Sequence, residues 1–239
     1  AIFGAALGVK VIEIWTDVDG ILTADPRLVK TAKLLDKISY KEASELATFG
    51  AKVLHPRTIR PAVKAGIPVR VLNSFNLKSE GTLILEKYES KNPVTAISSK
   101  TKVTLVNIYS TEMLLSKGFL SRIFEVFTRN NISVDLVSVS EVSVSVTLDN
   151  KDSMASVVKE LSEFSSVNTS EDFGMVSLIG EGVVTSSKNI SRIFDTLDKE
   201  GILVKMVSLG STDINVSLII KREQLEKAVK VLHDQILLN

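Results

Sequence analysis

Met113 to Asp149, MLLSKGFLSRIFEVFTRNNISVDLVSVSEVSVSVTLD, is the stretch that decides the fold. Apolar residues recur at three-to-four spacing between Phe119 and Phe127, which predicts a helix with one buried side. Two β-branched runs follow, Ile132 to Val139 and Val142 to Leu148, joined by the polar turn Ser140-Glu141. In the second run apolar residues alternate with Ser and Thr, which is typical of a strand buried on one face. The stretch therefore predicts a small α+β unit.

The same unit occurs twice in the chain. The four residues Ser-Arg-Ile-Phe at 121–124 recur at 191–194. The apolar and small residues of the following strand recur at the same offset: Val134, Leu136, Val137 and Ser138 correspond to Val204, Met206, Val207 and Ser208. An internal repeat of this kind indicates a pair of like modules, with small ligands expected at the seams between them.

Composition excludes several classes of protein. The net charge of +1 over 239 residues, without a basic run that carries interleaved aromatics, gives no support for nucleic-acid binding. The absence of cysteine excludes disulfide scaffolds, Cys-based zinc sites and Cys nucleophiles. The two histidines, His55 and His233, are far apart in sequence, so no His-rich metal site is expected within one chain. No apolar run reaches the roughly 20 residues of a membrane helix.

The chain before residue 89 alternates strand and helix patterns, as in a parallel α/β sheet. Strands are predicted at Val9 to Trp15 and Pro68 to Leu72, and helices at Ser39 to Phe49 and Arg57 to Ala65. The first of these helices begins with a Ser-x-x-Glu capping box that ends at Glu42. Tyr88 to Pro93 is polar and is predicted to be a linker.

An aspartate-rich loop follows the first predicted strand. It reads Thr16-Asp17-Val18-Asp19-Gly20 and continues to Arg27. Polar residues at the end of a buried strand are where open α/β sheets bind ligands. The same aspartates equally suit two successive turns, and Arg27 suits a surface cation. From the residues alone both interpretations stay open.

The two repeated modules are predicted to be interleaved. The first, β-α-β-β-α-β, runs from Val103 to about Phe173. The second runs from Val176 to the end of the chain and lacks a fourth strand. The short strand Thr95 to Ser98 is the natural substitute, which would place the first module inside the second. That hypothesis requires Ile97 to pair with a strand of the second module.

These motifs together resemble those of aspartate kinases. Residues 15–27 are similar to the family's nucleotide-binding loop, and residues 49–56 and 68–71 to later pieces of the same amino-acid-kinase fold. Residues 94–239 resemble the family's paired ACT domains. Within them, 118–120, 133–135 and 140–144 resemble the lysine-sensitive branch, and the modules are closest to the monofunctional plant enzymes.

The resemblance implies a fold and a division into domains. We expect an α/β protein, with the C-terminal part of an amino-acid-kinase parallel-sheet domain followed by two α+β, ferredoxin-like ACT domains. The first part would span 1–91, the nucleotide-binding side. The first ACT domain would span 101–173 and bind lysine, and the second would combine 93–99 with 174–239.

The resemblance also implies an activity. The family transfers the γ-phosphoryl group of MgATP to the side-chain carboxylate of L-aspartate, which gives 4-phospho-L-aspartate, the first intermediate toward lysine, threonine, methionine and isoleucine. Expected nucleotide contacts are Thr16, Asp17, Leu22, Arg27, Lys52 and Val53. Leu22 stands where the bacterial pattern often has Tyr. The family's Lys-Phe-Gly-Gly-Thr-Ser motif, with the catalytic residues, is expected to precede Ala1, so these 239 residues alone are expected to be inactive.

Feedback inhibition by L-lysine is expected to act through the first ACT domain, at the interface with a second subunit in a homodimer. The expected effector contacts are Met113, Ser116, Gly118, Phe119, Leu120, Ser133, Val134, Asp135, Ser140 and Glu141. Amides at a helix N-terminus suit the effector's carboxylate, and acidic side chains suit its ammonium groups. The second module carries Lys205 at the place of Asp135 and is expected to be structural.

Three alternatives remain at this stage. A regulatory-only, amino-acid-sensing ACT subunit would have no catalysis. A fused aspartate kinase–homoserine dehydrogenase finds no support within these 239 residues, which contain no Rossmann glycine fingerprint, although a truncated C-terminus would hide one. Other amino-acid kinases lack paired ACT modules. S-adenosylmethionine is a candidate second effector. The expected compartment is the plastid for a plant protein and otherwise the cytoplasm.

Overall fold

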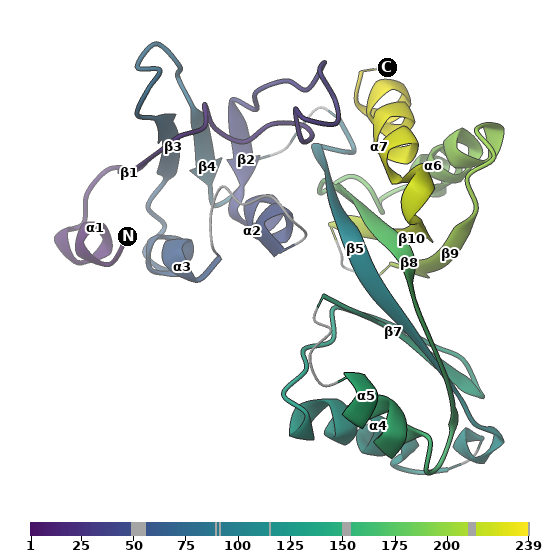
Figure 1. Ribbon diagram of the computed structural model, residues 1–239. Coiled ribbons are helices and arrows are strands. Elements are labelled where there is room, and N and C mark those ends of the chain that lie inside the picture. The colour runs from purple at the N-terminus through teal and green to yellow at the C-terminus, as the bar shows by residue number, and fades with distance from the viewer. Residues whose placement is uncertain are drawn as a thin grey trace.

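The computed structural model describes residues 1–48, 56–88, 90, 92–114, 116–149, 154–209 and 214–238. Within them the chain forms two sheets (Figure 1). A four-stranded sheet with the order β1-β3-β4-β2 belongs to the N-terminal part. A six-stranded antiparallel sheet with the order β6-β7-β5-β8-β10-β9 belongs to the rest. The fold is thus the expected combination of an α/β part and an ACT-like α+β part.

The N-terminal sheet is mixed in direction. Its strands are β1 (Ile12–Thr16), β2 (Lys37–Ser39), β3 (Val69–Asn73) and β4 (Thr82–Leu85). β1 runs parallel to β3 and β2 runs parallel to β4, but β3 and β4 are antiparallel. β2 and β4 were absent from the sequence analysis, because strands of three and four residues are too short to show alternation.

The turn before β4 depends on Gly81. Its φ is +68°, and a Cβ on this residue would lie 2.0 Å from the carbonyl oxygen of Val71. Only a residue without a side chain fits there, because both the backbone conformation and the space exclude Cβ. Gly81 thereby lets the chain turn tightly and bring β4 alongside β3.

Three helices accompany this sheet, α1 (Ile2–Leu7), α2 (Tyr40–Thr48) and α3 (Pro56–Lys64). Figure 1 shows them on the same side of the strands. Apolar residues of α2 and α3 form one core with the sheet, and this core also contains Ala96 and Ile179 of the six-stranded sheet. The capping box is confirmed, because the Glu42 carboxylate accepts a hydrogen bond from Ser39 N (3.1 Å) and Glu42 N donates to Ser39 Oγ (3.3 Å).

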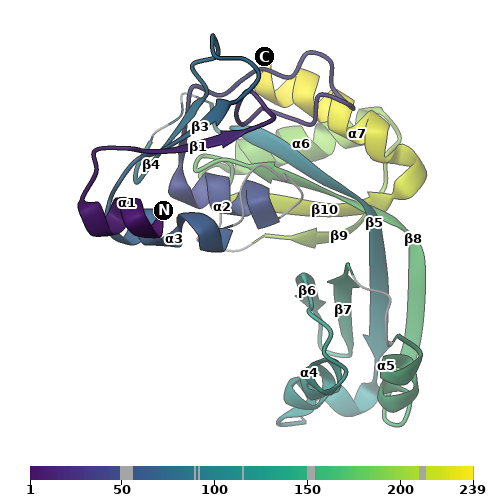
Figure 2. The same ribbon diagram turned by 60° about the vertical axis from the view of Figure 1, so that its left-hand side comes forward.

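Two 14-residue strands, β5 (Ala96–Tyr109) and β8 (Ser166–Ile179), run through both modules. Figure 2 shows them leaving the upper half of the molecule side by side and entering the lower module. The short strand expected at 95–98 and the first strand of the module that begins at Val103 are therefore one strand. Its register with β8 is irregular between Lys100 and Leu105, where it passes from one module to the other.

Ile97 pairs with Leu178 of β8, as the interleaved arrangement requires. β5 and β8 continue on the other side of the irregularity as the centre of the first module. That module adds β6 (Leu136–Val139) and β7 (Ser143–Leu148), and the second adds β9 (Val204–Ser208) and β10 (Asn215–Lys221). We keep the division into 1–91, 101–173 and 93–99 with 174–239 as a proposal.

The remaining helices flank these strands. The first module has a 3₁₀ turn (Thr111–Met113), α4 (Phe119–Arg129) and α5 (Met154–Leu161). The second has α6 (Ser187–Lys199), a 3₁₀ turn (Arg222–Gln224), α7 (Leu225–Leu232) and a π-helical turn (His233–Leu237). Each pair packs on its own apolar core.

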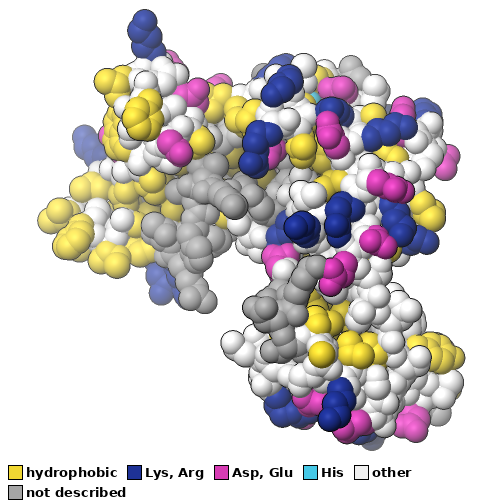
Figure 3. All heavy atoms as spheres, viewed as in Figure 1, with side chains coloured by type: hydrophobic (Ala, Val, Ile, Leu, Met, Phe, Trp, Pro, Cys, Tyr) yellow, Lys and Arg dark blue, Asp and Glu magenta, His cyan; other side chains and the backbone are white. Residues whose placement is uncertain are grey.

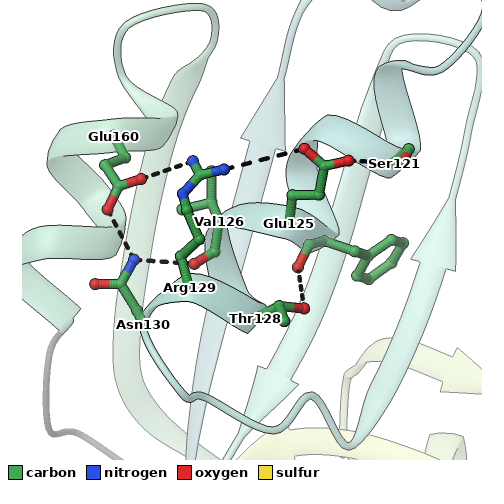
Figure 4. Close-up of polar contacts among 8 residues, drawn as sticks. Ser121, Glu125, Val126, Thr128, Arg129, Asn130 and Glu160 are labelled. Atoms are coloured by element: carbon green, nitrogen blue, oxygen red, sulfur yellow. Dashed lines mark hydrogen bonds and ion pairs between the residues drawn. The ribbon is translucent and has the colours of Figure 1, made fainter.

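A polar clamp joins α4 to α5 in the first module (Figure 4). Glu160 accepts hydrogen bonds from Arg129 Nη2 and from Asn130 Nδ2, both at 2.8 Å. Arg129 also lies 4.0 Å from Glu125, one turn back on its own helix. The clamp holds the ends of the two helices together above the apolar core.

The strand expected at Ile132 to Val139 is shorter than predicted, because β6 begins only at Leu136. Asn131 has a φ of +54° directly after α4, and Ile132 N bonds back to Phe127 O at 2.9 Å. The backbone N–H groups that follow α4 thus form the hydrogen bonds that end the helix. Asp135 N already bonds to Thr147 O (2.9 Å), so Asp135 stands just before the first residue of the strand.

Apolar side chains lie exposed over the N-terminal part, at the left of Figure 3. Ile2, Phe3 and Leu7 of α1 and Trp15 of β1 are 72%, 85%, 78% and 48% exposed. A group of large exposed apolar residues is typical of a surface that another part of a protein, or another molecule, covers. The two modules instead present a mixed charged surface in this view.

Candidate functional site

The aspartate-rich loop after β1 lines a cavity of about 440 Å³. Its walls are residues 16–18, 20–22 and 24–27, with Leu46 from α2 and residues 97–99 from β5. The structure thus brings together four of the six predicted nucleotide contacts: Thr16, Asp17, Leu22 and Arg27. Lys52 and Val53 lie outside the described residues.

The polar groups of this loop are partly committed to one another. Thr16 Oγ1 donates to Asp17 Oδ1 at 3.1 Å. The Arg27 guanidinium makes bidentate contact with the Asp25 carboxylate, at 2.6 Å for the shortest pair. This contact holds the pKa of the Asp25 carboxyl below its ordinary value. Arg27 is otherwise exposed, so its positive charge lies at the mouth of the cavity.

Asp19 has a structural partnership. Its carboxylate accepts hydrogen bonds from Asn73 Nδ2 (2.8 Å) and Asn76 Nδ2 (2.9 Å), which join the loop after β1 to the last residue of β3 and to the loop that follows it. Ser79 Oγ adds a bond to Asp19 O at 3.1 Å. Asp19 therefore serves as a turn residue that fixes the edge of the cavity.

The predicted effector residues fall into two groups at opposite ends of the first module. Ser140 and Glu141 form the turn between β6 and β7, and the 3₁₀ turn and start of α4 lie near it, because Ser110 N bonds to Val142 O (2.9 Å). Ser133, Val134 and Asp135 precede β6 at its other end. Asp135 and Ser140 are five positions apart, which corresponds to about 17 Å along an extended strand. The two groups therefore do not meet within one chain.

The first group offers backbone donors. Gly118 caps α4 with a φ of +83°, and no side-chain hydrogen bond caps the helix there. The amides of the first turn of α4 are thus directed at whatever lies before it. Phe119 is buried in the module's core, edge-on to the ring of Phe164 with ring centroids 5.7 Å apart. Met113 is partly buried against the same core.

The second group contains a half-buried charge cluster. Asp135 lies 3.3 Å from the Lys100 ammonium, which lies 2.5 Å from Asp149. Burial raises the pKa of the Asp135 carboxyl to about 6; Lys100 opposes this shift and the neighbouring Asp149 adds to it. Sequence analysis found Asp135 but missed Lys100 and Asp149, since neither lies in a motif.

The N-terminal part is joined to the second module by Glu42. This side chain is fully buried, and besides Ser39 it accepts hydrogen bonds from Thr95 Oγ1 (2.7 Å) and Glu181 N (3.3 Å). Glu45, one turn further on, contacts the side-chain amide of Asn215 in β10. The nucleotide-loop part and the ACT-like part thus share a polar junction as well as an apolar core.

Comparison with known proteins places both parts. Residues 1–73 match the model of the amino acid kinase family, and residues 106–163 and 176–236 match that of the ACT domain. The chain is 42% identical to aspartokinase 1, chloroplastic, of Arabidopsis thaliana, over 96% of this chain and 42% of the relative. It is 38% identical to lysine-sensitive aspartokinase 3 of Escherichia coli, over 99% of this chain and 54% of the relative. The chain thus spans about half the length of the curated relatives it matches.

Solved structures agree with these matches. Escherichia coli aspartokinase III in complex with aspartate and ADP superposes with a TM-score of 0.88 at 38% identity, over 98% of this chain and 54% of that one. Its complex with lysine and aspartate gives 0.87. Among the described residues no helix is long and apolar enough to cross a membrane. With an amino-acid-kinase part, two ACT-domain matches and these relatives, the chain belongs to the aspartokinase family.

Proposed function

We propose that the protein to which this chain belongs is an aspartate kinase. It would transfer the γ-phosphoryl group of MgATP to the side-chain carboxylate of L-aspartate and release 4-phospho-L-aspartate, the first step toward lysine, threonine, methionine and isoleucine. The observation that carries the proposal is the cavity after β1, whose walls include Thr16, Asp17, Leu22 and Arg27. A relative of the same fold was solved with aspartate and ADP.

The residues of the cavity would bind and orient the nucleotide. The Asp17 carboxylate offers acceptor oxygens to the nucleoside, and the Thr16 hydroxyl can donate or accept. Arg27 is exposed at the mouth and can exchange Asp25 for a phosphate, since guanidinium binds both in the same bidentate geometry. Lys52 and the Val53 backbone would lie near the phosphates. Phosphoryl transfer depends mainly on such positioning and charge neutralisation.

An assay of the full-length protein tests this proposal. ATP should be converted to ADP only when L-aspartate is present, and hydroxylamine should trap an acyl phosphate in equal amount. L-Glutamate is the matched control substrate, because it differs by one methylene. If the protein binds lysine but shows no aspartate-dependent turnover, the regulatory-only alternative replaces the kinase proposal.

The effector of the ACT part is proposed to be L-lysine. Asp135 is a half-buried carboxylate already arranged around an ammonium group, that of Lys100. The free amides at the start of α4 suit a carboxylate. A relative named lysine-sensitive and a structure containing lysine support this choice. Bound lysine would hold one of two arrangements of the protein, which requires different affinities for the two.

A homodimer would reunite the two groups of effector residues. β6 is an edge strand of the six-stranded sheet, and its Val137 and Val139 are 37% and 48% exposed. If two copies pair their β6 strands antiparallel about a two-fold axis, with Val137 opposite Ser138, then Asp135 of one copy lies opposite Ser140 of the other. One lysine could then contact both groups, which one chain holds about 17 Å apart.

The affinity for lysine should depend on pH through Asp135. An ammonium group binds the ionised carboxylate, and the pKa of Asp135 is raised from 3.8 to about 6. Affinity should therefore be constant above about pH 7 and weaken by up to about tenfold for each pH unit below about 6. The free energy of unfolding has the opposite pH dependence. The folded chain binds the proton of Asp135 more tightly than the unfolded chain does, so this group increases the free energy of unfolding as the pH falls from 6 toward 4.

Calorimetric titration with lysine between pH 5 and 8 measures this profile. Lysine itself does not titrate in this range, and Lys100 and Asp149 are the charged groups that face Asp135. An Asp135→Asn variant that still binds lysine should show a flat profile. A wild-type affinity that is equal at pH 5 and pH 7 would contradict the assignment of Asp135.

The compartment follows from the source of the protein. Relatives from Arabidopsis thaliana are named chloroplastic, and others come from bacteria and fungi. We infer a plastid location if the source is a plant, and the cytoplasm otherwise.

A further inference from the structure

Thr23, in the middle of the loop that lines the proposed nucleotide cavity, makes four hydrogen bonds to three residues, and one of them is the bond that its N–H donates to Lys33 O at 2.9 Å. Its hydroxyl lies 2.9 Å from Nε2 of His233 and accepts a bond from Lys33 N at 2.9 Å. Its carbonyl oxygen accepts a bond from Ile97 N of β5 at 2.8 Å. Two of the three partners belong to the ACT part of the chain. His233 is separated from Thr23 by 210 positions in sequence.

His233 is an unusual residue for its position. It is fully buried at the point where α7 gives way to the π-helical turn, on a helix whose other inward residues are apolar. Its Nδ1 is buried without a hydrogen-bond partner among the described residues and lies 3.6 Å from the Asp234 carboxylate. An apolar residue would pack there without the free-energy cost of burying an unpaired polar nitrogen. The bond to Thr23 is the one polar contact within hydrogen-bond distance that the imidazole makes in the described structure.

Holding Thr23 fixes one wall of the cavity. Leu22 and Ala24, on either side of it, line the cavity, as do residues 97–99 of the strand that binds its carbonyl. Ala24 and Val29 are buried in the core of the second module together with residues of α7. In Figure 1 the N-terminal loops lie beside α7. The position of α7 thereby determines where this part of the loop can lie.

We propose that His233 is a positioning residue for the nucleotide site: through the Thr23 hydroxyl it holds the loop at residues 21–27 in its binding conformation. This role rests on the proposed nucleotide site and adds to it a residue from the last helix of the chain. The Thr23–His233 bond also gives the ACT pair a direct polar contact with that site. A shift in the position of α7 would therefore shift the loop. The Thr23–His233 bond is a physical link of the kind that coupling between sites requires.

Four variants test the role in the full-length protein. Thr23→Val and His233→Phe keep the shapes of the side chains but remove the hydrogen bond. Thr23→Ser keeps the hydroxyl, and His233→Gln supplies an amide that can donate or accept, whichever tautomer His233 has. Ser217→Ala is the matched control, because it removes a buried bond of 2.8 Å, to Ser177, and neither of these two residues lines the cavity.

The readout is the ATP dissociation constant, measured by calorimetric titration. We expect ATP to bind about three- to tenfold more weakly to Thr23→Val and His233→Phe, the range for one lost hydrogen bond. The rescue variants and Ser217→Ala should bind within about twofold of the wild type. At saturating ATP kcat should stay nearly constant, so that KM alone rises.

The outcomes separate this inference from the proposed function. If the wild-type protein binds no ATP, the nucleotide site itself is wrong. If the wild type binds ATP and Thr23→Val and His233→Phe bind it equally well, the role of His233 is wrong while the site stands. Equal weakening in Ser217→Ala would show a general loss of stability and would also overturn the role. A double variant no weaker than either single one supports it, because both remove the same bond.

Discussion

Replacing Asp135 by alanine should raise the lysine concentration for half-inhibition about 10- to 100-fold and leave kcat without lysine unchanged. The carboxylate is half-buried and directly precedes β6, the edge strand that we propose as the dimer contact. A hydrogen bond to a charged group is worth about 1.5–3 kcal/mol, which corresponds to that range in affinity. The cavity proposed to bind nucleotide is lined mainly by the loop after β1 and does not include Asp135, so catalysis should be spared.

Two control variants sharpen this result. Asp149→Ala removes the more exposed carboxylate of the same cluster, 52% exposed against 22% for Asp135, and should weaken inhibition less. Asp172→Ala removes an exposed carboxylate of β8 that only approaches Lys221 at 4.0 Å, and should change nothing. Unchanged inhibition in Asp135→Ala would remove this residue from the effector site.

Replacing Glu42 by alanine should lower the free energy of unfolding by about 3 kcal/mol, the range for breaking a buried charged interaction. Its fully buried carboxylate accepts bonds from the backbone and hydroxyl of Ser39, from Thr95 Oγ1 and from Glu181 N. Without it, donors from the N-terminal part and from the second module stay buried and unpaired. The loss should therefore appear as a weaker junction between the two parts.

Urea denaturation measures this loss. Glu42→Gln should be intermediate. The amide keeps one acceptor oxygen, but its NH₂ group replaces the second oxygen and faces N–H and O–H donors that it cannot bond. Glu226→Ala is the surface control: Glu226 pairs with Lys230 one turn along α7, and such exposed pairs contribute little to stability. A loss in Glu42→Ala no larger than that of Glu226→Ala would show that the junction does not depend on this carboxylate.

The repeated modules could be predicted from the sequence because their pattern is local. Helical spacing identified α4, alternation identified β7, and the internal repeat indicated that α6 and β9 form a second unit of the same kind. The interleaving followed from counting strands, and Ile97 does pair with Leu178. The sequence pattern did not predict that single long strands, β5 and β8, run through both modules. In β5, residues 100–102 interrupt the apolar run where the strand passes from one module to the other.

The candidate sites show the same limit. Thr16, Asp17, Leu22 and Arg27 were found through a contiguous motif and line one cavity. Glu42 was recognised as a capping residue, but its bonds to Thr95 and Glu181 depend on long-range packing. Lys100, Asp149 and His233 were missed as functional residues for the same reason, because each acts on a partner tens or hundreds of positions away.

Calorimetric titration of this 239-residue chain with L-lysine, and with L-threonine as the control, tests the central claim most directly. We predict that lysine binds, that threonine gives no heat of binding, and that Asp135→Ala weakens lysine binding by about 10- to 100-fold. Binding of threonine in place of lysine, or lysine binding that is unaffected in Asp135→Ala, would contradict the account of the effector site.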